Sequence, residues 1–299
     1  MPRETEEKLA RSLTAETTDL LPYLPYLLQD LWELGANPTE IIRLIKKHMP
    51  LSNDMKILDL ACGKGAVSIK IAESLGIHVH GIDIIPEFIE YANQKAKELN
   101  AGALCHFACG DVNAAVNTAT NYDCVIFGAT GDILGNPPET LRKLTKTIRP
   151  GGYVVMDECY LPDGSSNEEV RYKNYDYLTH EQWLHIFKDS GLTLVEETVA
   201  EENSFDYSND MQAITLYSRF DASGKGIGKA DKLDRGFSQT GSQIAAQQGS
   251  FPFHQNFNIT FAAGERACKE ENNHNYRNHQ NKKNNEKNKK PEAHGDTGH

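Results

Sequence analysis

Short apolar runs alternate with amphipathic stretches of helical length through the middle of the chain. Apolar residues in these stretches recur at three- and four-residue spacing, as Val67, Ile71 and Leu75 do, which is typical of a helix that covers a sheet. Strands that alternate with such helices predict βαβ units, right-handed crossovers and a mainly parallel sheet. The predicted strands are residues 56–60, 79–84, 105–110, 124–129 and 152–158.

The two ends of this alternating region have different patterns. Before it, leucines at helical spacing predict helices, so residues 1–50 are assigned to an N-terminal helical cap. After it come an insert rich in Tyr, Asp and Glu near residues 160–190 and two apolar runs at 192–199 and 213–220. No helical pattern separates these runs, so we expect an antiparallel hairpin. The predicted fold over residues 51–220 is a doubly wound α/β domain with a mainly parallel seven-stranded sheet and an antiparallel last strand.

Residues 221–299 differ in composition from the rest of the chain. Gly, Ser and Gln come first, and the segment NNHNYRNHQNKKNNEKNKK then contains almost no apolar residue. Such a segment cannot bury enough apolar surface to offset the entropy of ordering it, so the tail is predicted to be of low complexity and disordered. Residues 249–264, GSFPFHQNFNITFAAG, are the one stretch of the tail in which we expect a short strand or a docking peptide.

The charge is unevenly distributed along the chain. The 299 residues include 31 Lys and Arg and 42 Asp and Glu, which gives a net charge of −11. From residue 221 onward, basic residues outnumber acidic ones by 12 to 9, so the acidic excess lies in the first 220 residues. An acidic body repels a phosphate backbone, which argues against a nucleic-acid substrate.

The sequence also indicates a cellular compartment. No run approaches the roughly 20 apolar residues of a membrane span, and the charged opening MPRETEEKLARS does not resemble a signal peptide. The six cysteines form no CxxC pair, which favours free thiols over a disulfide framework. The protein is therefore expected in the cytoplasm, without membrane contact. No metal site is predicted, because the tail histidines have irregular spacing and no paired cysteines: His274, His279, His294 and His299.

The stretch LDLACGKGAVS, residues 58–68, places a carboxylate, Asp59, ahead of a glycine turn at Gly63 and Gly65. A dinucleotide-binding turn needs a third glycine or alanine where Ser68 stands, and a phosphate-binding loop needs Ser or Thr directly after Lys64. A ligand with an ammonium group and no phosphate fits better, because a carboxylate attracts the ammonium and bare glycines let the backbone come close. S-Adenosylmethionine is such a ligand.

The segment ILDLACGKG resembles the first motif of class I S-adenosylmethionine-dependent methyltransferases, with Ala61 where that family often has glycine. The resemblance covers roughly residues 50–220 and is to enzymes that act on ubiquinone and menaquinone precursors and on small metabolites. It implies that Asp83 holds the ribose, Asp111 the adenine, and Phe127 to Thr130 the methionine part. Any one of these aspartates can instead be a helix N-cap. The implied cofactor-binding residues are Asp59, Ala61, Gly63, Gly65, Asp83, Ile84, Asp111, Val112, Phe127 and Gly128.

Candidates for contacting the methyl acceptor follow the fourth and fifth predicted strands and lie in the helical cap and the insert. Methyl transfer to a good nucleophile is an in-line displacement in which the enzyme mainly aligns the acceptor, so a dedicated base is optional. Asp157 is the first candidate for a catalytic side chain. Aromatic residues of the insert could form a lid over a small organic acceptor, although each also has a structural interpretation as packing or surface. The other candidates are Tyr23, Tyr26, Asp132, Glu158, Tyr160, Tyr172, Tyr175, Tyr177 and His180.

The stretch GNPPET contains Asn-Pro-Pro, which an aromatic residue follows in amino-methylating enzymes of nucleic acids. Here Glu139 takes the place of the aromatic residue, and the motif begins nine residues after Phe127. A helix start fits better, with Asn136 as N-cap, Pro137 in the first turn and Glu139 closing a capping box. No Pro-Cys dipeptide occurs, so the cysteine route to cytosine methylation lacks its signature.

The sequence thus favours an enzyme that transfers a methyl group from S-adenosylmethionine to a small-molecule acceptor. Two alternatives stay open. A methyltransferase acting on protein or RNA could use the Asn- and Lys-rich tail as an electrostatic arm. A non-catalytic module could bind the cofactor for regulation.

Overall fold

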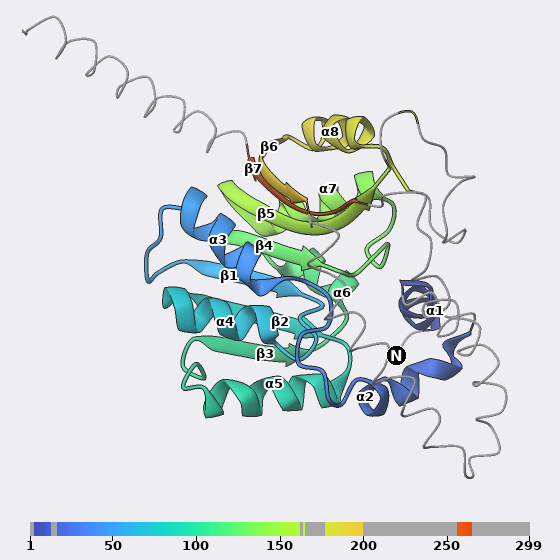
Figure 1. The fold of residues 1–299 in the computed structure, drawn as a ribbon, viewed down its shortest axis with the longest axis vertical. Coiled ribbons are helices and arrows are strands. Elements are labelled where there is room, and N and C mark those ends of the chain that lie inside the picture. The colour runs from blue at the N-terminus through green and yellow to red at the C-terminus, as the bar shows by residue number, and fades with distance from the viewer. Residues whose placement is uncertain (1–2, 13–16, 162–163, 165–176, 200–255, 265–299) are drawn as a thin grey trace, which may run out of the picture.

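A mainly parallel sheet forms the centre of the protein (Figure 1). The computed structural model describes residues 3–12, 17–161, 164, 177–199 and 256–264. The strand order is β3-β2-β1-β4-β5-β7-β6. The strands are β1 (Lys56–Leu60), β2 (His78–Asp83), β3 (Cys105–Cys109), β4 (Tyr122–Gly128), β5 (Ile148–Tyr160), β6 (Leu192–Val199) and β7 (Asn256–Gly264).

The predicted parallel core is confirmed. Strands β1 to β5 lie within a few residues of the five predicted runs and pair in parallel throughout. Strand β1 pairs with β2 on one side and with β4 on the other, so the order of the chain reverses beside β1. Ligands of doubly wound sheets bind at this reversal, outside the carboxyl ends of the strands.

Helices cover both faces of the sheet because successive side chains of a buried strand point in opposite directions. Ile126 and Val155 pack into a cluster with α3 and α4, whereas their neighbours Phe127 and Met156 pack into a cluster with α6, α7 and α8. Strands buried on both faces need apolar residues at almost every position, which explains their continuous apolar runs. The helices are α3 (Pro38–His48), α4 (Ala66–Leu75), α5 (Pro86–Glu98), α6 (Val112–Thr118), α7 (Pro137–Thr147) and α8 (His180–Asp189).

Three short N-terminal elements lie near the carboxyl ends of the strands (Figure 1). They are α1 (Arg3–Ser12), the 3-10 helix η1 (Thr18–Tyr23) and α2 (Leu24–Leu27). Leu20, Leu24 and Leu27 pack against Ile85 and Phe88 at the start of α5. The helical N-terminal region predicted from leucine spacing is thus present, and it reaches the edge of the sheet where ligands are expected.

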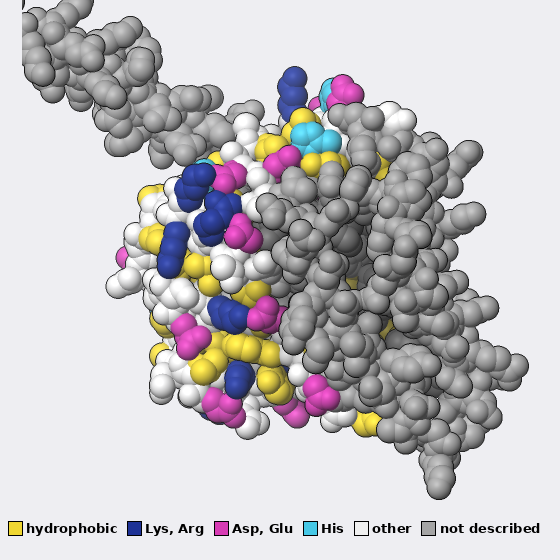
Figure 2. All heavy atoms as spheres, viewed as in Figure 1, with side chains coloured by type: hydrophobic (Ala, Val, Ile, Leu, Met, Phe, Trp, Pro, Cys, Tyr) yellow, Lys and Arg dark blue, Asp and Glu magenta, His cyan; other side chains and the backbone are white. Residues whose placement is uncertain are grey.

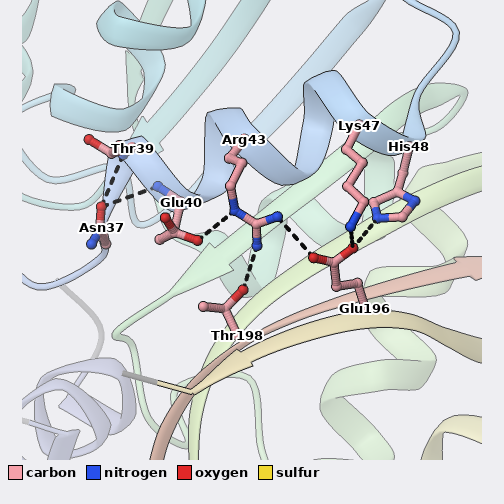
Figure 3. Close-up of polar contacts among 8 residues, drawn as sticks. All are labelled: Asn37, Thr39, Glu40, Arg43, Lys47, His48, Glu196 and Thr198. Atoms are coloured by element: carbon pink, nitrogen blue, oxygen red, sulfur yellow. Dashed lines mark hydrogen bonds and ion pairs between the residues drawn. The ribbon is translucent and has the colours of Figure 1, made fainter. Parts of the chain in front are cut away.

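A network of ion pairs joins α3 to β6 (Figure 3). Arg43 Nη1, Lys47 Nζ and His48 Nε2 each contact the Glu196 carboxylate, at 2.9, 2.6 and 2.6 Å. Arg43 Nη2 also donates a 2.6 Å hydrogen bond to Thr198 Oγ1. Hydrogen bonds from these three residues hold the pKa of Glu196 at about 2. The network holds α3, the last helix of the N-terminal region, against the edge strand β6.

Strand β6 pairs antiparallel with β7, which comes from the tail. The sequence predicted residues 213–220 as this partner, and those residues lie outside the described part of the chain. Strand β7, Asn256–Gly264, lies within residues 249–264, the stretch of the tail in which a short strand or a docking peptide was expected. Strand β7 lies between β5 and β6 and pairs with both, so two neighbouring strands supply the hydrogen bonds that tail composition alone cannot reveal. Residues 221–255 and 265–299 lie outside the described residues.

Charges of both signs alternate on the described part of the face drawn in Figure 2, over α3, α4 and α5. Many form pairs, such as Lys70 with Glu33 and Arg43 with Glu40. This part of the surface is therefore not a continuous basic patch of the kind that binds a phosphate backbone.

Candidate active site

The glycine turn leaves β1 in an unusual backbone conformation. Ala61, Gly63 and Gly65 all have left-handed φ angles, of 57°, 53° and 73°. Gly65 also has no room for a side chain, because a Cβ built on it would lie 2.8 Å from Phe107 Cζ and 2.9 Å from Ala92 Cβ. Both conformation and packing therefore require glycine at residue 65. The backbone of the turn lies at the carboxyl end of β1 and is accessible to a ligand bound there.

Asp59 is a buried carboxylate at the end of β1. Its side-chain oxygen Oδ2 accepts a 2.5 Å hydrogen bond from Ser68 Oγ on α4. Burial raises the pKa of Asp59 to about 7; the Ser68 hydrogen bond opposes this rise and the nearby Asp83 carboxylate adds to it. A buried carboxylate of this kind is stabilised in its ionised form by a cation.

Asp83 at the end of β2 is bound to the glycine turn. Its Oδ2 accepts a 2.8 Å hydrogen bond from the Gly63 N–H, and its Oδ1 accepts one of 2.9 Å from the Ile85 N–H. Burial raises its pKa, and these backbone hydrogen bonds oppose the rise. The structure thus brings two of the predicted cofactor residues, Asp59 and Asp83, close to one short turn.

A hollow lies where the strand order reverses, between β1 and β4. Its volume is about 430 Å³, including the space at its solvent-open entrance. Four of the predicted cofactor residues line it: Asp59, Ala61, Gly63 and Gly128. The opposite wall comes from the chain between α2 and α3, which sequence reasoning did not assign to the site. Its residues carry no recognisable motif; only the Gly35 in WELGAN marks a break in the helical pattern. These wall residues are Trp32, Glu33, Leu34 and Ala36.

Asp157 lies next to this hollow. It stands in register with Gly128 on the neighbouring strand. A Cβ built on Gly128 would lie 3.6 Å from Asp157 Cβ and 2.9 Å from Ala36 Cβ. A side chain at residue 128 would therefore clash with Ala36 in the outer wall and would contact Asp157. Burial raises the pKa of Asp157 to about 6.

The loop after β4 carries two buried polar atoms without hydrogen-bond partners in the described part of the chain, Thr130 Oγ1 and Asp132 Oδ1. Ala129 and Gly131 have φ angles of 54° and 57°, so the loop is tightly folded. Asp132 Oδ2 lies 3.5 Å from Arg11 Nη1 on α1. Buried polar atoms without partners are costly, and a polar ligand would satisfy them.

Asp111 does not line the hollow. It is the N-cap of α6, where Oδ1 accepts a 2.8 Å hydrogen bond from the Asn113 N–H. Its Oδ2 accepts a 2.9 Å hydrogen bond from Thr5 Oγ1 on α1. The Val112 and Phe127 side chains are buried in the core on the face away from Asp59, so only their backbones are available to a ligand. Ile84 packs beside the N-terminal leucines.

The aromatic acceptor candidates are separated from the hollow. Tyr160 and His180, with ring centroids 4.8 Å apart, line a different crevice together with Glu158. This crevice lies between β5 and α8, on the sheet face opposite Asp157, because side chains alternate along β5. Tyr26 is 52% exposed, and Tyr23 packs beside the leucine cluster. Of the remaining candidates, Tyr177 is buried, and two lie outside the described residues: Tyr172 and Tyr175.

The Asn-Pro-Pro stretch begins a helix, as predicted. Asn136 Oδ1 accepts a 3.0 Å hydrogen bond from the Glu139 N–H, and Pro137 occupies the first turn of α7. The Glu139 carboxylate pairs with Lys143 at 2.9 Å and does not close the predicted capping box with the Asn136 N–H. This stretch is therefore a helix cap.

Comparison with known proteins agrees with the fold and the glycine turn. The doubly wound order, the turn after β1 and the aspartates at two strand ends define the class I S-adenosylmethionine-dependent methyltransferases. A family model described as a methyltransferase domain matches residues 51–204, and the chain belongs to that family.

Several curated relatives are methyltransferases of small metabolites. Phosphoethanolamine N-methyltransferase 1 of Arabidopsis thaliana is 27% identical over 162 residues, which are 53% of this chain and 32% of that protein. The uncharacterised protein YjhP of Escherichia coli is 27% identical over 168 residues, 54% of this chain and 66% of that protein. The chain thus matches about a third of the length of the plant relative.

Solved structures share the fold. A methyltransferase from Thiobacillus denitrificans, solved with S-adenosylhomocysteine, has a TM-score of 0.64 at 21% identity and covers 80% of this chain and 97% of its own. The structure of YjhP has a TM-score of 0.66 at 19% identity, with 82% and 100% covered.

The residues of the hollow fit S-adenosylmethionine, the cofactor of this class. Asp59 is a buried carboxylate that a cation would stabilise, and S-adenosylmethionine carries an ammonium group. Gly63 presents bare backbone to the hollow. None of the described helices is long and apolar enough to cross a bilayer. No group of three His, Cys, Asp or Glu among the described residues could hold a metal ion.

Proposed function

We propose that this protein transfers a methyl group from S-adenosylmethionine to a small polar acceptor that binds at the carboxyl ends of β4 and β5. One observation carries the proposal: Gly128 lines the hollow that contains Asp59 and Gly63 and stands in register with Asp157, whose Cβ lies 3.6 Å from a Cβ built on Gly128. Donor and acceptor sites are then adjacent, as direct transfer requires.

The cofactor residues take the roles that the family resemblance implies. Asp59 attracts the ammonium of the methionine part, and the Gly63 backbone lies against that part. Asp83 accepts the ribose hydroxyls, since each of its oxygens accepts one backbone N–H and retains a second lone pair. Asp111 and Val112 lie beside the adenine.

The acceptor side uses polar groups around the rim. When bound, the cofactor supplies an electrophilic methyl group. The chain aligns the acceptor with that group and excludes water, and such positioning can contribute about 7–11 kcal/mol of the barrier. Asp157, with its pKa of about 6, is ionised at neutral pH and can accept a proton from the acceptor or pair with its positive charge. Thr130 and Asp132 supply further hydrogen-bonding atoms.

Two further observations support a small acceptor. Curated relatives include methyltransferases named for phosphoethanolamine and for a sterol, the latter in Caenorhabditis elegans. Charges of both signs alternate on the described part of the surface in Figure 2, which does not favour a nucleic acid.

Cofactor binding is tested first by thermal unfolding. S-Adenosylhomocysteine at about 100 times its dissociation constant should stabilise the protein by about 2.7 kcal/mol, and NAD should not. A shift with NAD alone would overturn the assignment. The acceptor is then sought by incubating the protein with a methyl-labelled cofactor and a metabolite extract. Label in a small molecule supports the proposal, label in protein or RNA favours a macromolecular acceptor, and binding without any labelled product indicates a regulatory module.

Asp157→Asn tests the acceptor side once a product is known. The variant should lose most of its turnover while binding S-adenosylhomocysteine normally, and the wild-type rate should fall as the pH drops through about 6. Asp54→Asn, a change at an exposed loop residue, serves as the control. Unchanged turnover and pH profile in Asp157→Asn would remove Asp157 from the site.

A further inference from the structure

Lys64, in the centre of the glycine turn, is a buried cation. Only 4% of the residue is exposed. Its Nζ donates hydrogen bonds to three backbone carbonyl oxygens, those of Leu28 at 2.5 Å, Gln29 at 3.1 Å and Leu31 at 2.6 Å. A lysine ammonium has three N–H donors, so these three carbonyls use all of them.

Aromatic rings complete the surroundings of this ammonium. Nζ lies 4.9 Å from the centroid of the Tyr91 ring and 5.8 Å from that of Phe88, both on α5. Both distances are within the range of cation–π attraction. Burial lowers the pKa of Lys64, which is the cost of placing a charge there. The carbonyls and rings together offset that cost.

The main chain of the turn contacts the same segment. Trp32 Nε1 donates a 3.2 Å hydrogen bond to the Lys64 carbonyl oxygen. A Cβ built on the neighbouring Gly63 would lie 3.1 Å from Leu34 Cδ1. Residues 28–36, which we call the wall segment, are therefore held by both the side chain and the backbone of the glycine turn.

The wall segment forms the outer side of the cofactor hollow. It belongs to no helix or strand, so it has no backbone ladder of its own to fix it. Its far end packs against the loop after β4, where a Cβ built on Gly35 would lie 2.6 Å from Ala129 Cβ. At its near end, beside the start of α5 (Figure 1), the Lys64 ammonium binds the carbonyls.

We propose that Lys64 is a positioning residue, which fixes the wall segment over the cofactor hollow and does not itself bind the cofactor. This inference rests on the proposed function for the identity of the ligand. A lysine beside a glycine turn is often interpreted as a residue that binds a phosphate or a carboxylate of the ligand. Here all three N–H groups of the ammonium donate to backbone carbonyl oxygens of the protein itself. The Lys64 charge therefore stabilises the wall of the hollow.

The main test compares Lys64→Met with Lys97→Met, a change at an exposed lysine on α5. Lys64→Met should weaken binding of S-adenosylhomocysteine at least tenfold in calorimetry and speed amide hydrogen exchange in residues 28–36 at least tenfold. Lys97→Met should change neither. Wild-type affinity in Lys64→Met, or unchanged exchange in the wall segment, would overturn the proposal. A variant that merely lost stability would show faster exchange across the whole sheet.

A second measurement uses the wild-type protein and does not depend on a variant that folds. An amine-labelling reagent followed by mass spectrometry should modify Lys97 and leave Lys64 protected, with or without S-adenosylhomocysteine. A Lys64 that is reactive in the free protein and protected by the ligand would instead bind the ligand, and the proposal would fail. If wild-type protein binds no S-adenosylhomocysteine, the proposed function fails, while labelling and exchange still decide the role of Lys64.

Discussion

Ser68 Oγ donates a 2.5 Å hydrogen bond to Asp59 Oδ2, and both side chains are buried. The bond joins the end of β1 to the first turn of α4 across the glycine turn. It fixes the direction of the carboxylate and lowers its pKa against the larger, opposing effect of burial. From the sequence alone, Ser68 showed only that the turn is not a dinucleotide-binding motif. In the structure, Ser68 orients the Asp59 carboxylate at the hollow.

Cofactor binding should depend on pH through Asp59. Its pKa of about 7 means that the free protein holds a proton on this carboxyl at pH 6 and has lost it at pH 8. The ligand's ammonium prefers the carboxylate, so binding should expel the proton. Affinity for S-adenosylhomocysteine should therefore rise about tenfold from pH 6 to pH 8, because the ionised fraction of Asp59 rises from about one tenth to about nine tenths over this range.

Calorimetry in two buffers of different ionisation enthalpy would measure the proton released at pH 7. Asp59→Asn should bind weakly with no pH dependence over this range. Wild-type binding that is equally tight at pH 6 and pH 8 would contradict the role of Asp59.

Removing the hydroxyl in Ser68→Ala should shift this pH dependence upward. Without its donor, the Asp59 carboxylate is less stable, so its pKa rises further and binding at pH 7 weakens. A buried acceptor that loses its partner costs about 1–3 kcal/mol, which urea unfolding would detect. Ser52→Ala, at an exposed residue, should behave as wild type. If the binding midpoint of Ser68→Ala stayed near pH 7, the hydrogen bond would not tune Asp59.

Alanine substitutions at two left-handed glycines distinguish the energetic cost of backbone strain from that of steric crowding. Gly65 and Gly76 have φ angles of 73° and 68° at the two ends of α4, but only Gly65 is crowded. Gly76→Ala should cost about 1–2 kcal/mol for the left-handed conformation alone. Gly65→Ala should cost about 1–3 kcal/mol more, because its methyl group meets Phe107 and Ala92. Equal losses in urea unfolding would show that the Gly65 turn relaxes freely.

The contacts of Glu196 should stabilise the protein in a pH-dependent way. Its pKa is held near 2, below its ordinary value of 4.5, so its stabilisation is complete above pH 4.5 and is lost as the pH falls toward 2. Glu196→Gln should lower thermal stability at pH 7 by about 1 kcal/mol, or about 2–4 °C. The difference from wild type should shrink at pH 3. Glu90→Gln, on exposed α5 surface, is the control. A difference that is the same at both pH values would assign the loss to packing.

Much of the fold was predictable because its signals are local. The apolar runs of β1 to β5, the left-handed Gly65 and the Asn136 cap each depend on a few adjacent residues. A short strand within residues 249–264 was expected, but its place between β5 and β6 was not predictable, because its hydrogen bonds come from strands about a hundred and about sixty residues earlier in the chain.

The candidate site was predictable in part for the same reason. Asp59 and Gly128 lie at the ends of β1 and β4, Gly63 lies in the turn after β1, and all three line one hollow. The wall segment has no motif, and its place depends on the Lys64 side chain, which no spacing rule reveals. An aspartate at a strand end can be a ligand or a helix cap, and only the Asn113 and Thr5 contacts show that Asp111 caps α6. Its role toward adenine stays a prediction.

Asp83 has a thermodynamic consequence for the whole site. By accepting the Gly63 and Ile85 N–H groups it holds the turn in shape without a ligand. Little chain then has to become ordered when the cofactor arrives, so more of the interaction energy is retained as affinity. The heat-capacity change on association should accordingly match the apolar area that the ligand itself covers, with no added contribution from coupled folding.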